Sequence, residues 1–194
     1  MIRLSELLAT PITQVVEVLL AHAERGNFQR PGLLETPQRF ADAWAFFTKG
    51  YEENPADVLK TFEDGAEGYD EMVVVSKIPV FSLCEHHALP FFGHAHIGYI
   101  PDGRVLGLSK FGRLVEVFAR RLQVQERMTV QIADALEEHL KPKGVGVILE
   151  CRHLCMEMRG IRTAGSVAIT NVLRGAMEQG KVREEFLALK TGRV

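Results

Sequence analysis

The chain has no long hydrophobic run. No apolar stretch in its 194 residues approaches the roughly 18–20 residues that a bilayer-spanning helix needs. The segment from Met1 to Thr10 carries one arginine and lacks the continuous apolar core of a secretion signal. We therefore expect no membrane association and a cytoplasmic location.

A strong excess of either charge is also missing, since the formal net charge is -2. General nucleic-acid binders are usually basic, so we expect no nucleic-acid partner. A nearly neutral total still leaves room for a local basic pocket that binds an anionic small molecule.

Cysteine is scarce, with three residues and no Cys-x-x-Cys pair. An odd number leaves at least one thiol free, which argues against a disulfide framework. Cysteines in a reducing compartment more often bind metal, do chemistry or pack in the core. The missing Cys-x-x-Cys pair weakens the case for a purely structural zinc site.

The N-terminal third has the apolar spacing of helices. Apolar residues recur at helical intervals from Ile12 to Leu20, and Gly26 is a suitable stop. Thr36 as N-cap and Pro37 at the first helical position predict a second helix that ends near Gly50. We interpret residues 1–68 as an N-terminal helical arm.

The pattern changes after Gly68, and we interpret residues 69–194 as a single catalytic core. Two predicted strands precede two long helices from Ser109 to Leu140, and two more strands follow, the first from Val145 to Met158. This order predicts an α+β fold, in which an antiparallel sheet carries two core helices on one face. Such a sheet has open edges, and oligomerisation is one way to cover them.

The strongest local signal is Cys84-Glu85-His86-His87, joined far downstream by His153-Leu154-Cys155. On a regular strand, His153 and Cys155 would share one face. Three ligands, Cys84, His87 and Cys155, suit a catalytic zinc ion with an open fourth position. His86 and His153 would remain for proton transfer.

Two plainer interpretations stay open at this point. The cysteines could pack and the histidines could lie on the surface, or the metal could be purely structural. Cys151 precedes His153 by two residues, so it is either a fourth ligand or a neighbouring free thiol, and we favour the free thiol. As a free thiol it would make the protein more sensitive to oxidation.

Several basic residues could bind an anion. Ser109 can cap the helix that follows it, and Lys110 and Arg113 lie three residues apart on one helix face. Arg159 follows the second metal segment, and Arg39 follows the Thr36-Pro37 start. Taken alone, each is more simply a solvated surface residue.

Glu126, preceded by Gln125, begins the second core helix. A glutamate carboxylate can accept two N–H bonds from the N1 and N2 edge of guanine, and such charge-assisted bonds are strong. The plainer interpretation is a first-turn glutamate that favours the helix dipole.

Taken together, these segments resemble the GTP cyclohydrolase I family, and the match covers nearly the whole chain after about residue 11. The matching segments are Thr36-Pro37-Gln38-Arg39, Cys84-Glu85-His86-His87, His96 to Pro101, Gly107 to Lys110 with Arg113, Arg121 to Arg127, His153 to Met156, Met158-Arg159-Gly160 and Arg183 to Leu187. Their order and joint occurrence are far more specific than any one of them.

The resemblance implies a tunnelling fold (T-fold), in which antiparallel sheets from several subunits join into a barrel. It implies a homo-oligomer, commonly a decamer of two pentamers, with active sites at subunit interfaces. The activity implied is hydrolytic opening of the GTP imidazole ring at C8, release of formate and rearrangement to 7,8-dihydroneopterin triphosphate. That product begins tetrahydrofolate, biopterin or deazaguanine synthesis.

The resemblance also implies a role for each motif residue. Cys84, His87 and Cys155 would hold Zn²⁺, and His86 and His153 would move protons. Further roles go to Ser109 near the ribose and triphosphate, to Lys110, Arg113 and Arg159 on the triphosphate, to Arg39 from a neighbouring subunit, and to Glu126 with Gln125 on guanine.

Two alternatives share the implied fold. A nitrile reductase of queuosine synthesis uses a cysteine nucleophile and a nicotinamide cofactor, and it needs no zinc triad. A non-catalytic guanine-nucleotide binding protein would lack a metal ligand or a catalytic histidine. The complete set of Cys84, His87 and Cys155 with both histidines argues against each of them.

Overall fold

The computed structural model describes residues 3–62 and 68–192. The chain forms two compact units, Met1–Thr48 and Lys49–Val194. The division thus falls after Thr48, whereas the sequence analysis drew the boundary of the arm after Gly68. Within the described ranges, no helix has both the length and the apolar character needed to cross a membrane.

The first unit is helical, as its periodicity predicts. It contains α1 (Leu4–Ala9), α2 (Ile12–Ala23), the 3-10 turn η1 (Pro31–Leu33) and α3 (Thr36–Thr48), with α2 packed against α3. Gly26 adopts a φ of +89° and donates its N–H to the carbonyl of Ala21, which confirms the predicted stop after α2. Helix α3 begins at Thr36, one residue before the predicted first position at Pro37, so Thr36 is its first residue and not its N-cap.

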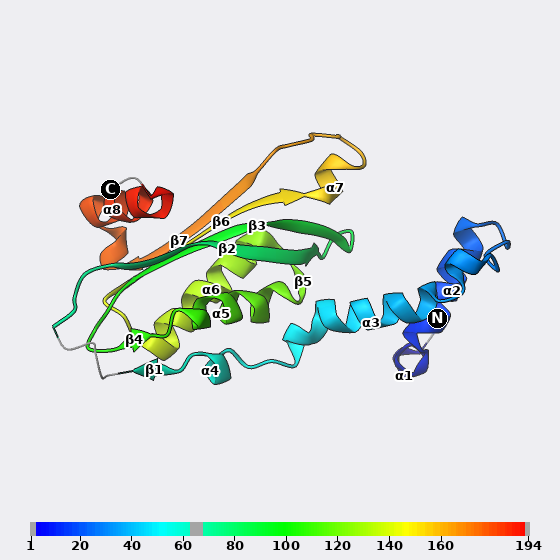
Figure 1. The fold of residues 1–194 in the computed structure, drawn as a ribbon, viewed down its shortest axis with the longest axis horizontal. Coiled ribbons are helices and arrows are strands. Elements are labelled where there is room, and N and C mark those ends of the chain that lie inside the picture. Colours follow the sequence, from blue (N-terminus) through cyan, green and yellow to red (C-terminus); the bar gives the residue numbers. More distant parts are fainter. Residues whose placement is uncertain (1–2, 63–67, 193–194) are drawn as a thin grey trace. The chain divides into compact units, whose positions relative to one another are not determined.

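The second unit is built on a five-stranded sheet in the order β5-β2-β3-β6-β7 (Figure 1). The four long strands, β2 (Val73–Cys84), β3 (Leu89–Ile100), β6 (Gly144–His153) and β7 (Ala168–Gly175), pair antiparallel. The two-residue β5 (Leu122–Gln123) runs parallel to the end of β2. A separate pair joins β1 (Thr61–Phe62) to β4 (Val105–Leu106).

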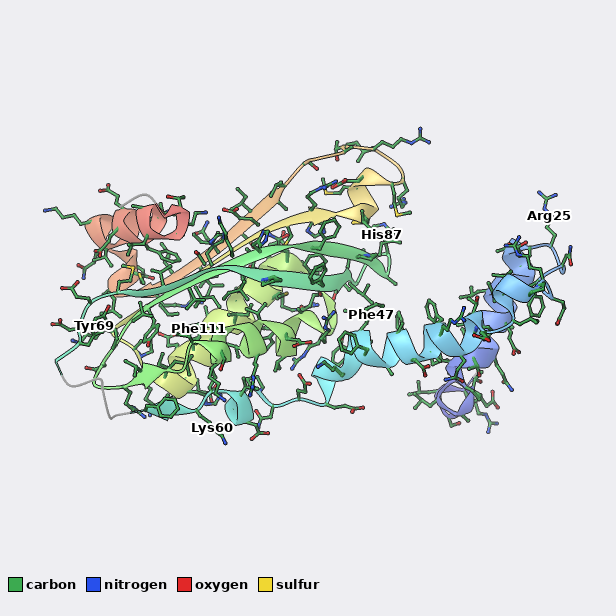
Figure 2. All side chains as sticks on the ribbon, in the orientation of Figure 1. Arg25, Phe47, Lys60, Tyr69, His87 and Phe111 are labelled. Atoms are coloured by element: carbon green, nitrogen blue, oxygen red, sulfur yellow. The ribbon has the colours of Figure 1, made fainter. Side chains whose placement is uncertain are left out.

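Helices α5 (Ser109–Ala119) and α6 (Gln125–Leu140) cover one face of this sheet (Figure 1). Their apolar stripes meet alternate strand residues, and Phe111, Leu114, Met128 and Ile132 are fully buried there (Figure 2 labels Phe111). The α+β prediction, with two core helices on one face of an antiparallel sheet, is therefore confirmed. The closure of several sheets into a barrel stays a prediction.

The opposite face holds the C-terminal helix α8 (Gly180–Thr191), after the 3-10 turn η3 (Ala176–Glu178). Gly98 on β3 and Gly146 on β6 lie side by side in the register, and the Phe186 ring fills the space above them. A Cβ at either glycine would come within 2.8 Å of that ring. These two glycines therefore create the slot that anchors α8.

One predicted strand is too long. The sequence analysis extended the strand from Val145 to Met158, but β6 ends at His153 and the short helix α7 (Leu154–Glu157) follows directly. The turn of α7 is closed by the Met158 N–H, which donates to the carbonyl of Leu154. The remaining short elements are η2 (Lys49–Tyr51) and α4 (Pro55–Val58), the latter capped by the Asn54 side chain.

Candidate metal centre and nucleotide site

The first two candidate ligands lie on the tight turn between β2 and β3. The N–H groups of His87 and Ala88 both donate to the carbonyl of Cys84, and Ala88 takes a φ of +52°. Cys84 ends β2 opposite Leu89, so bonds within the turn bring Cys84 and His87 together. Figure 2 shows His87 at the tip of this hairpin.

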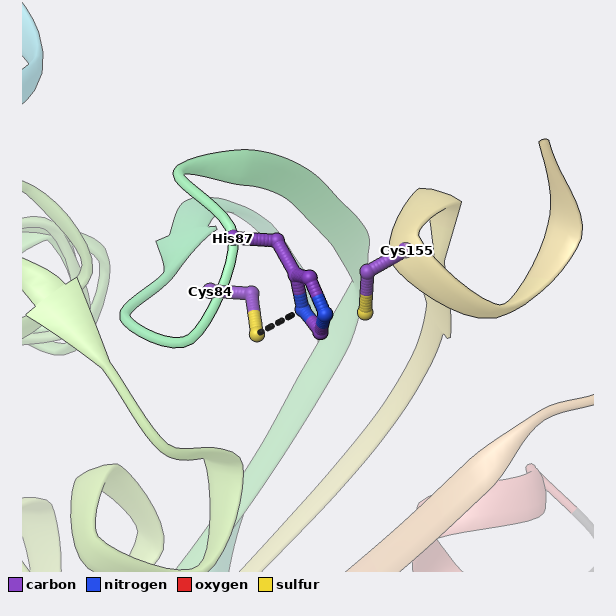
Figure 3. Close-up of side chains that lie close together, drawn as sticks. All are labelled: Cys84, His87 and Cys155. Carbon is purple, nitrogen blue, oxygen red and sulfur yellow. Dashed lines mark hydrogen bonds between the residues drawn. The ribbon is translucent and has the colours of Figure 1, made fainter. Parts of the chain in front are cut away.

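The third candidate, Cys155, is brought to the turn by pairing between strands. His153 pairs with Phe91 where β6 meets β3, and Cys155 follows in the first turn of α7. His153 and Cys155 therefore do not share a strand face, contrary to the prediction, because the strand ends between them. The change to helix directs Cys155 toward the turn that carries Cys84 and His87 (Figure 3).

The three ligand atoms, two thiol sulfurs and one imidazole nitrogen, lie within 4.8 Å of one another. Sγ of Cys84 is 4.0 Å from Nδ1 of His87, the contact dashed in Figure 3. Zinc bonds of about 2.3 Å to sulfur and 2.0–2.1 Å to nitrogen place tetrahedral ligands roughly 3.4–3.8 Å apart. Small side-chain rotations would bring this donor set onto a zinc ion, so the residues fit the metal.

The electrostatics of the cluster agree with a cation site. Burial raises the pKa of Cys155, and the neighbouring Cys84 raises it further. Two adjacent thiols are hard to ionise together unless a cation lies between them. Among the described residues, no fourth Cys, His, Asp or Glu joins these three ligands, which matches a catalytic rather than a structural site.

Cys151 is not part of the cluster. Its side chain is 0% exposed and packs in the core formed by the sheet and the helices α5 and α6. Burial raises the pKa of this thiol to about 12. The free-thiol interpretation is confirmed, whereas the burial and high pKa argue against the expected sensitivity to oxidation.

His153 is held in a defined position beside the cluster. Its ring stacks on Phe91 with centroids 4.6 Å apart and planes inclined by 8°. Its Nε2 lies 2.8 Å from Oε1 of Gln125. Burial lowers the pKa of His153, and the nearby Glu126 carboxylate opposes that shift. The imidazole therefore favours its neutral form near pH 7 and can accept a proton.

His86 lies on the other side of the cluster, with Nδ1 3.6 Å from Sγ of Cys84. Both histidines contribute to one open pocket of about 300 Å³ beside the metal ligands. The lining includes Cys84, His86, Gln123, Val124, Gln125, Glu126, His153, Cys155, Met156, Ala168 and Thr170. The structure thus brings together two ligands, both proton-transfer candidates and the candidate guanine reader.

The segment from β5 into α6 supports this pocket from two sides. Arg127 forms an ion pair with Glu85 and donates to Oε1 of Gln123, and the Glu85 N–H donates to the Gln123 carbonyl. These bonds hold the metal-bearing turn. Gln125 reaches the other way, to His153 and to the strands β6 and β7.

Sequence reasoning missed these supporting residues. It assigned no role to Arg127, Gln123, Phe91 or Thr170, and it assigned Gln125 to the substrate. The alternation of glutamines in Gln123-Val124-Gln125 marks two sides of one segment, a signal that could have indicated two roles. Nothing local to Thr170 or Phe91 indicates theirs.

The candidate triphosphate residues lie elsewhere on the second unit. Ser109 and Arg113 line a different hollow, together with Ile78, Pro79 and Phe81 of β2. Leu108 occupies the N-cap of α5, so the prediction that Ser109 caps this helix is wrong, and Ser109 is instead its first residue. Lys110 follows in the same turn.

The structure separates Ser109 from the metal cluster by the length of a helix. The end of α5 leads into β5, which pairs with Leu83 and Cys84. Ser109, ten residues before that end, is about 15 Å farther along the helix axis. Figure 1 shows α5 starting at the end of the sheet away from the β2–β3 turn.

The two remaining arginines differ in their surroundings. Arg159 lies at the metal cluster, where its Nη1 is 2.7 Å from Nε2 of His87. Arg39 belongs to α3 in the first unit and forms an ion pair with Glu35. Their roles toward a triphosphate stay predictions.

Three protein ligands with an open position, beside two histidines in a shared pocket, define a mononuclear hydrolytic metal centre. Comparison with known proteins gives the particular family. Residues 12–191 match the family model described as GTP cyclohydrolase I, and the chain belongs to that family.

Curated relatives agree with this assignment. A protein named GTP cyclohydrolase 1 from Janthinobacterium sp. (strain Marseille) is 57% identical, over 88% of this chain and 86% of the relative. One of the same name from Nitrosospira multiformis is 59% identical, over 82% of this chain and 84% of the relative. The Homo sapiens protein of that name is 54% identical, over 84% of this chain and 65% of its own length.

Among solved structures, one titled as the archaeosine synthase QueF-Like in the apo form has a TM-score of 0.44 and 20% identity, over 54% of this chain and 94% of that chain. The family model and the close relatives confirm the resemblance seen in the sequence. They favour the cyclohydrolase hypothesis over the nitrile reductase alternative.

Proposed function

We propose that this chain converts GTP and water into formate and 7,8-dihydroneopterin triphosphate. The observation that carries the proposal is the Cys84, His87 and Cys155 cluster, which opens on a pocket shared with His86, His153 and Glu126. A pocket that contains metal ligands, titratable imidazoles and one exposed carboxylate has the groups needed to hydrolyse a C–N bond of a purine.

Cys84, His87 and Cys155 would hold the zinc ion. When bound, zinc supplies Lewis acidity and a water that ionises near neutral pH, as the attack on C8 requires. Residues that do not touch the metal support its ligands, since Arg127 and Gln123 fix the turn that carries Cys84 and His87. The β2–β3 turn and the start of α7 therefore set the relative positions of the three ligands.

His86 and His153 would move the protons. Protonation of the base at N7 makes C8 more electrophilic, and the ring then opens as the C8–N bond breaks. A neutral imidazole can take a proton from water and return it to the departing nitrogen. Stacking on Phe91 keeps His153 in the pocket while this occurs.

Glu126 would select guanine. It lies in the first turn of α6, is exposed, and lines the pocket that contains the metal ligands. Its carboxylate can accept the N1–H and one N2–H of guanine. Adenine offers neither donor, because its N1 carries no proton and its C2 carries no amino group.

A second copy of the chain would supply the triphosphate site. Ser109, Lys110 and Arg113 lie at the far end of α5, so one copy does not bring them to its own metal cluster. Two long sheet edges favour assembly: β7 ends the sheet on one side, and β5 covers only Leu83 and Cys84 of β2 on the other.

Exposed apolar side chains accompany those edges, with Phe81 on β2 and Ile169 on β7 both more than half exposed. Joining β7 of one copy to β2 of the next would continue the sheet around a ring. We infer a homo-oligomer with active sites between copies, and the family resemblance suggests two pentamers that form a decamer. Arg39 and Arg159 would add positive charge, and the cytoplasm remains the expected location.

The direct test incubates zinc-loaded protein with GTP. Formate is measured together with neopterin fluorescence after oxidation and phosphatase treatment. We expect both signals, and we expect a chelator to abolish them. Zinc-loaded protein that binds GTP and yields neither product would instead support the non-catalytic binding protein.

A further inference from the structure

Gln125 is buried, with 3% of its surface exposed, although it sits in the wall of the candidate active site. Its side-chain amide is bonded at both ends. The nitrogen Nε2 lies 3.2 Å from the carbonyl of Leu149, 3.0 Å from that of Ala168 and 3.1 Å from Oγ1 of Thr170. The oxygen Oε1 lies 2.8 Å from Nε2 of His153.

These contacts fix which way the amide points. Backbone carbonyls only accept hydrogen bonds, so the group facing Leu149 and Ala168 must be the NH₂. The amide oxygen therefore faces His153, and an amide oxygen only accepts. Nε2 of His153 must carry a proton to make this bond, whether the ring is neutral or protonated.

Two threonine hydroxyls complete this network, Thr170 at the side-chain amide and Thr129 at the main-chain carbonyl of Gln125. Thr129 donates its single hydroxyl proton to the carbonyl of Gln125 at 2.7 Å. The 2.6 Å contact between the Thr129 and Thr170 hydroxyls must then be donated by Thr170. Oγ1 of Thr170 is left to accept from Gln125, so all three groups that face the amide nitrogen are acceptors.

We propose that Gln125 is a positioning residue, which holds His153 with Nε2 protonated and leaves Nδ1 as the nitrogen that exchanges protons with the substrate. Phe91 fixes the plane of the ring by stacking, and Gln125 fixes which nitrogen is free. The inference rests on the proposed function for its catalytic meaning. It replaces the expectation that Gln125 reads guanine, because the NH₂ of its amide faces protein acceptors and its oxygen is bonded to His153.

The first experiment measures the tautomer in the wild-type protein. Solid-state ¹⁵N NMR of the zinc-loaded protein with labelled histidine gives separate signals for the two ring nitrogens, and a His153→Gln sample identifies which signals belong to His153. We expect a protonated Nε2 and an unprotonated Nδ1 for the neutral ring. A protonated Nδ1 with a bare Nε2 would overturn the proposal without any further variant.

The second experiment compares two buried glutamines. Gln125→Leu removes the acceptor for His153. Gln123→Leu removes an amide that bonds the Phe118 carbonyl, Gln131 and Arg127 but not His153, so it is a control for the His153 ¹⁵N signals alone. We expect the His153 ¹⁵N pattern to change only in Gln125→Leu. In that variant kcat should fall by at least about tenfold, with KM for GTP changed by less than about threefold and zinc content retained.

Gln125→Glu provides the conservative rescue, since a carboxyl oxygen at this position still accepts from His153. Its carboxyl group lacks the NH₂ that donates to Leu149 and Ala168, so we expect Nε2 of His153 to stay protonated and kcat to lie between the Gln125→Leu and wild-type values. The proposal would be overturned if Gln125→Leu kept the wild-type tautomer of His153 but showed a higher KM for GTP and lost discrimination against other nucleotides. Gln125 would then contact the substrate directly. If the wild type makes no formate, the proposed function fails, and the ¹⁵N signals still decide whether Gln125 sets the tautomer.

Discussion

The guanidinium of Arg127 donates a 2.5 Å hydrogen bond to Oε2 of Glu85, which ties the first turn of α6 to the turn that carries His86 and His87. Arg127 also bonds the Leu122 carbonyl and Gln123. Its contact lowers the pKa of Glu85 below the ordinary value. The pair is therefore charged at neutral pH, and it is lost only in acid, as the carboxylate becomes protonated below its lowered pKa.

Arg127→Met should loosen the metal-bearing turn and weaken zinc binding by roughly tenfold, since supporting residues commonly contribute on that scale. Glu85→Gln should cost less, because Arg127 keeps its bonds to Leu122 and Gln123. Competition with a chromophoric chelator at pH 7 measures both. Equal zinc affinity in wild type and Arg127→Met would show that the bonds within the β2–β3 turn are sufficient to position its ligands.

Cys155→Ser should lose zinc and activity together, because hydroxyl oxygen is a poor replacement for a thiolate on zinc. Metal analysis after gel filtration measures the loss. Cys151→Ala is the matched control, and it should keep zinc because the Cys151 thiol is buried away from the cluster. A Cys155→Ser protein with full zinc content would remove Cys155 from the ligand set.

Glu126→Ala should weaken selection of guanine without releasing zinc. We expect kcat/KM for GTP to fall by roughly a hundredfold, the scale of a lost charge-assisted recognition contact. For inosine triphosphate, which lacks the N2 amino group, kcat/KM should fall by a smaller factor in Glu126→Ala. Glu138→Ala, on the same helix but outside the pocket, is the control. Undiminished preference for GTP over the inosine nucleotide in Glu126→Ala would contradict guanine readout there.

A mixture of two inactive variants tests whether the site is shared between copies. Arg113→Ala damages the triphosphate half and Cys155→Ser the metal half. Random co-assembly of equal amounts should restore about one quarter of the sites, because each needs an intact half from both neighbours. Cys84→Ser mixed with Cys155→Ser should restore none. Failure of the first mixture after verified subunit exchange would place both halves in one chain.

Cys151 should make stability depend on alkaline pH. Folding raises the pKa of this thiol to about 12, from an ordinary value of 9.0. Its contribution to stability is therefore complete below about pH 9 and is lost as the pH rises toward 12, because only the unfolded chain releases the proton. The Tm advantage of wild type over Cys151→Ala should shrink between pH 8 and 11. A constant difference would show that the thiol does not remain protonated on folding.

The sequence predicted the parts of the molecule that local chemistry determines. The helical periods at Ile12 and Ser109 and the Cys84-x-x-His87 turn depend on residues close together in the chain, and all three are present. Cys155 was assigned correctly by its motif, but the geometry given for it was wrong. A strand that changes to helix at Leu154 has no strong local signal, because α7 is only four residues long.

The role of Gln125 shows why the remainder could not be predicted. Its bonding partners lie 24 to 45 residues away in the chain, on two different strands and at the end of one of them. Only the register of β6 against β7 brings Leu149 opposite Thr170 and makes a buried site for the amide. From the sequence alone, Gln125 stands next to Glu126 and is therefore most simply assigned to the same role, binding guanine.

The division of the ligands between a hairpin and a distant helix has a consequence for how the chain matures. Cys84 and His87 lie on the turn of one hairpin, whereas Cys155 reaches them only through the pairing of β6 with β3, with α5 and α6 between them along the chain. Loop closure over such a span is slow compared with hairpin formation. We therefore expect tight metal uptake to be a late event in folding, since a chain in which β6 has not docked offers zinc two of the three ligands.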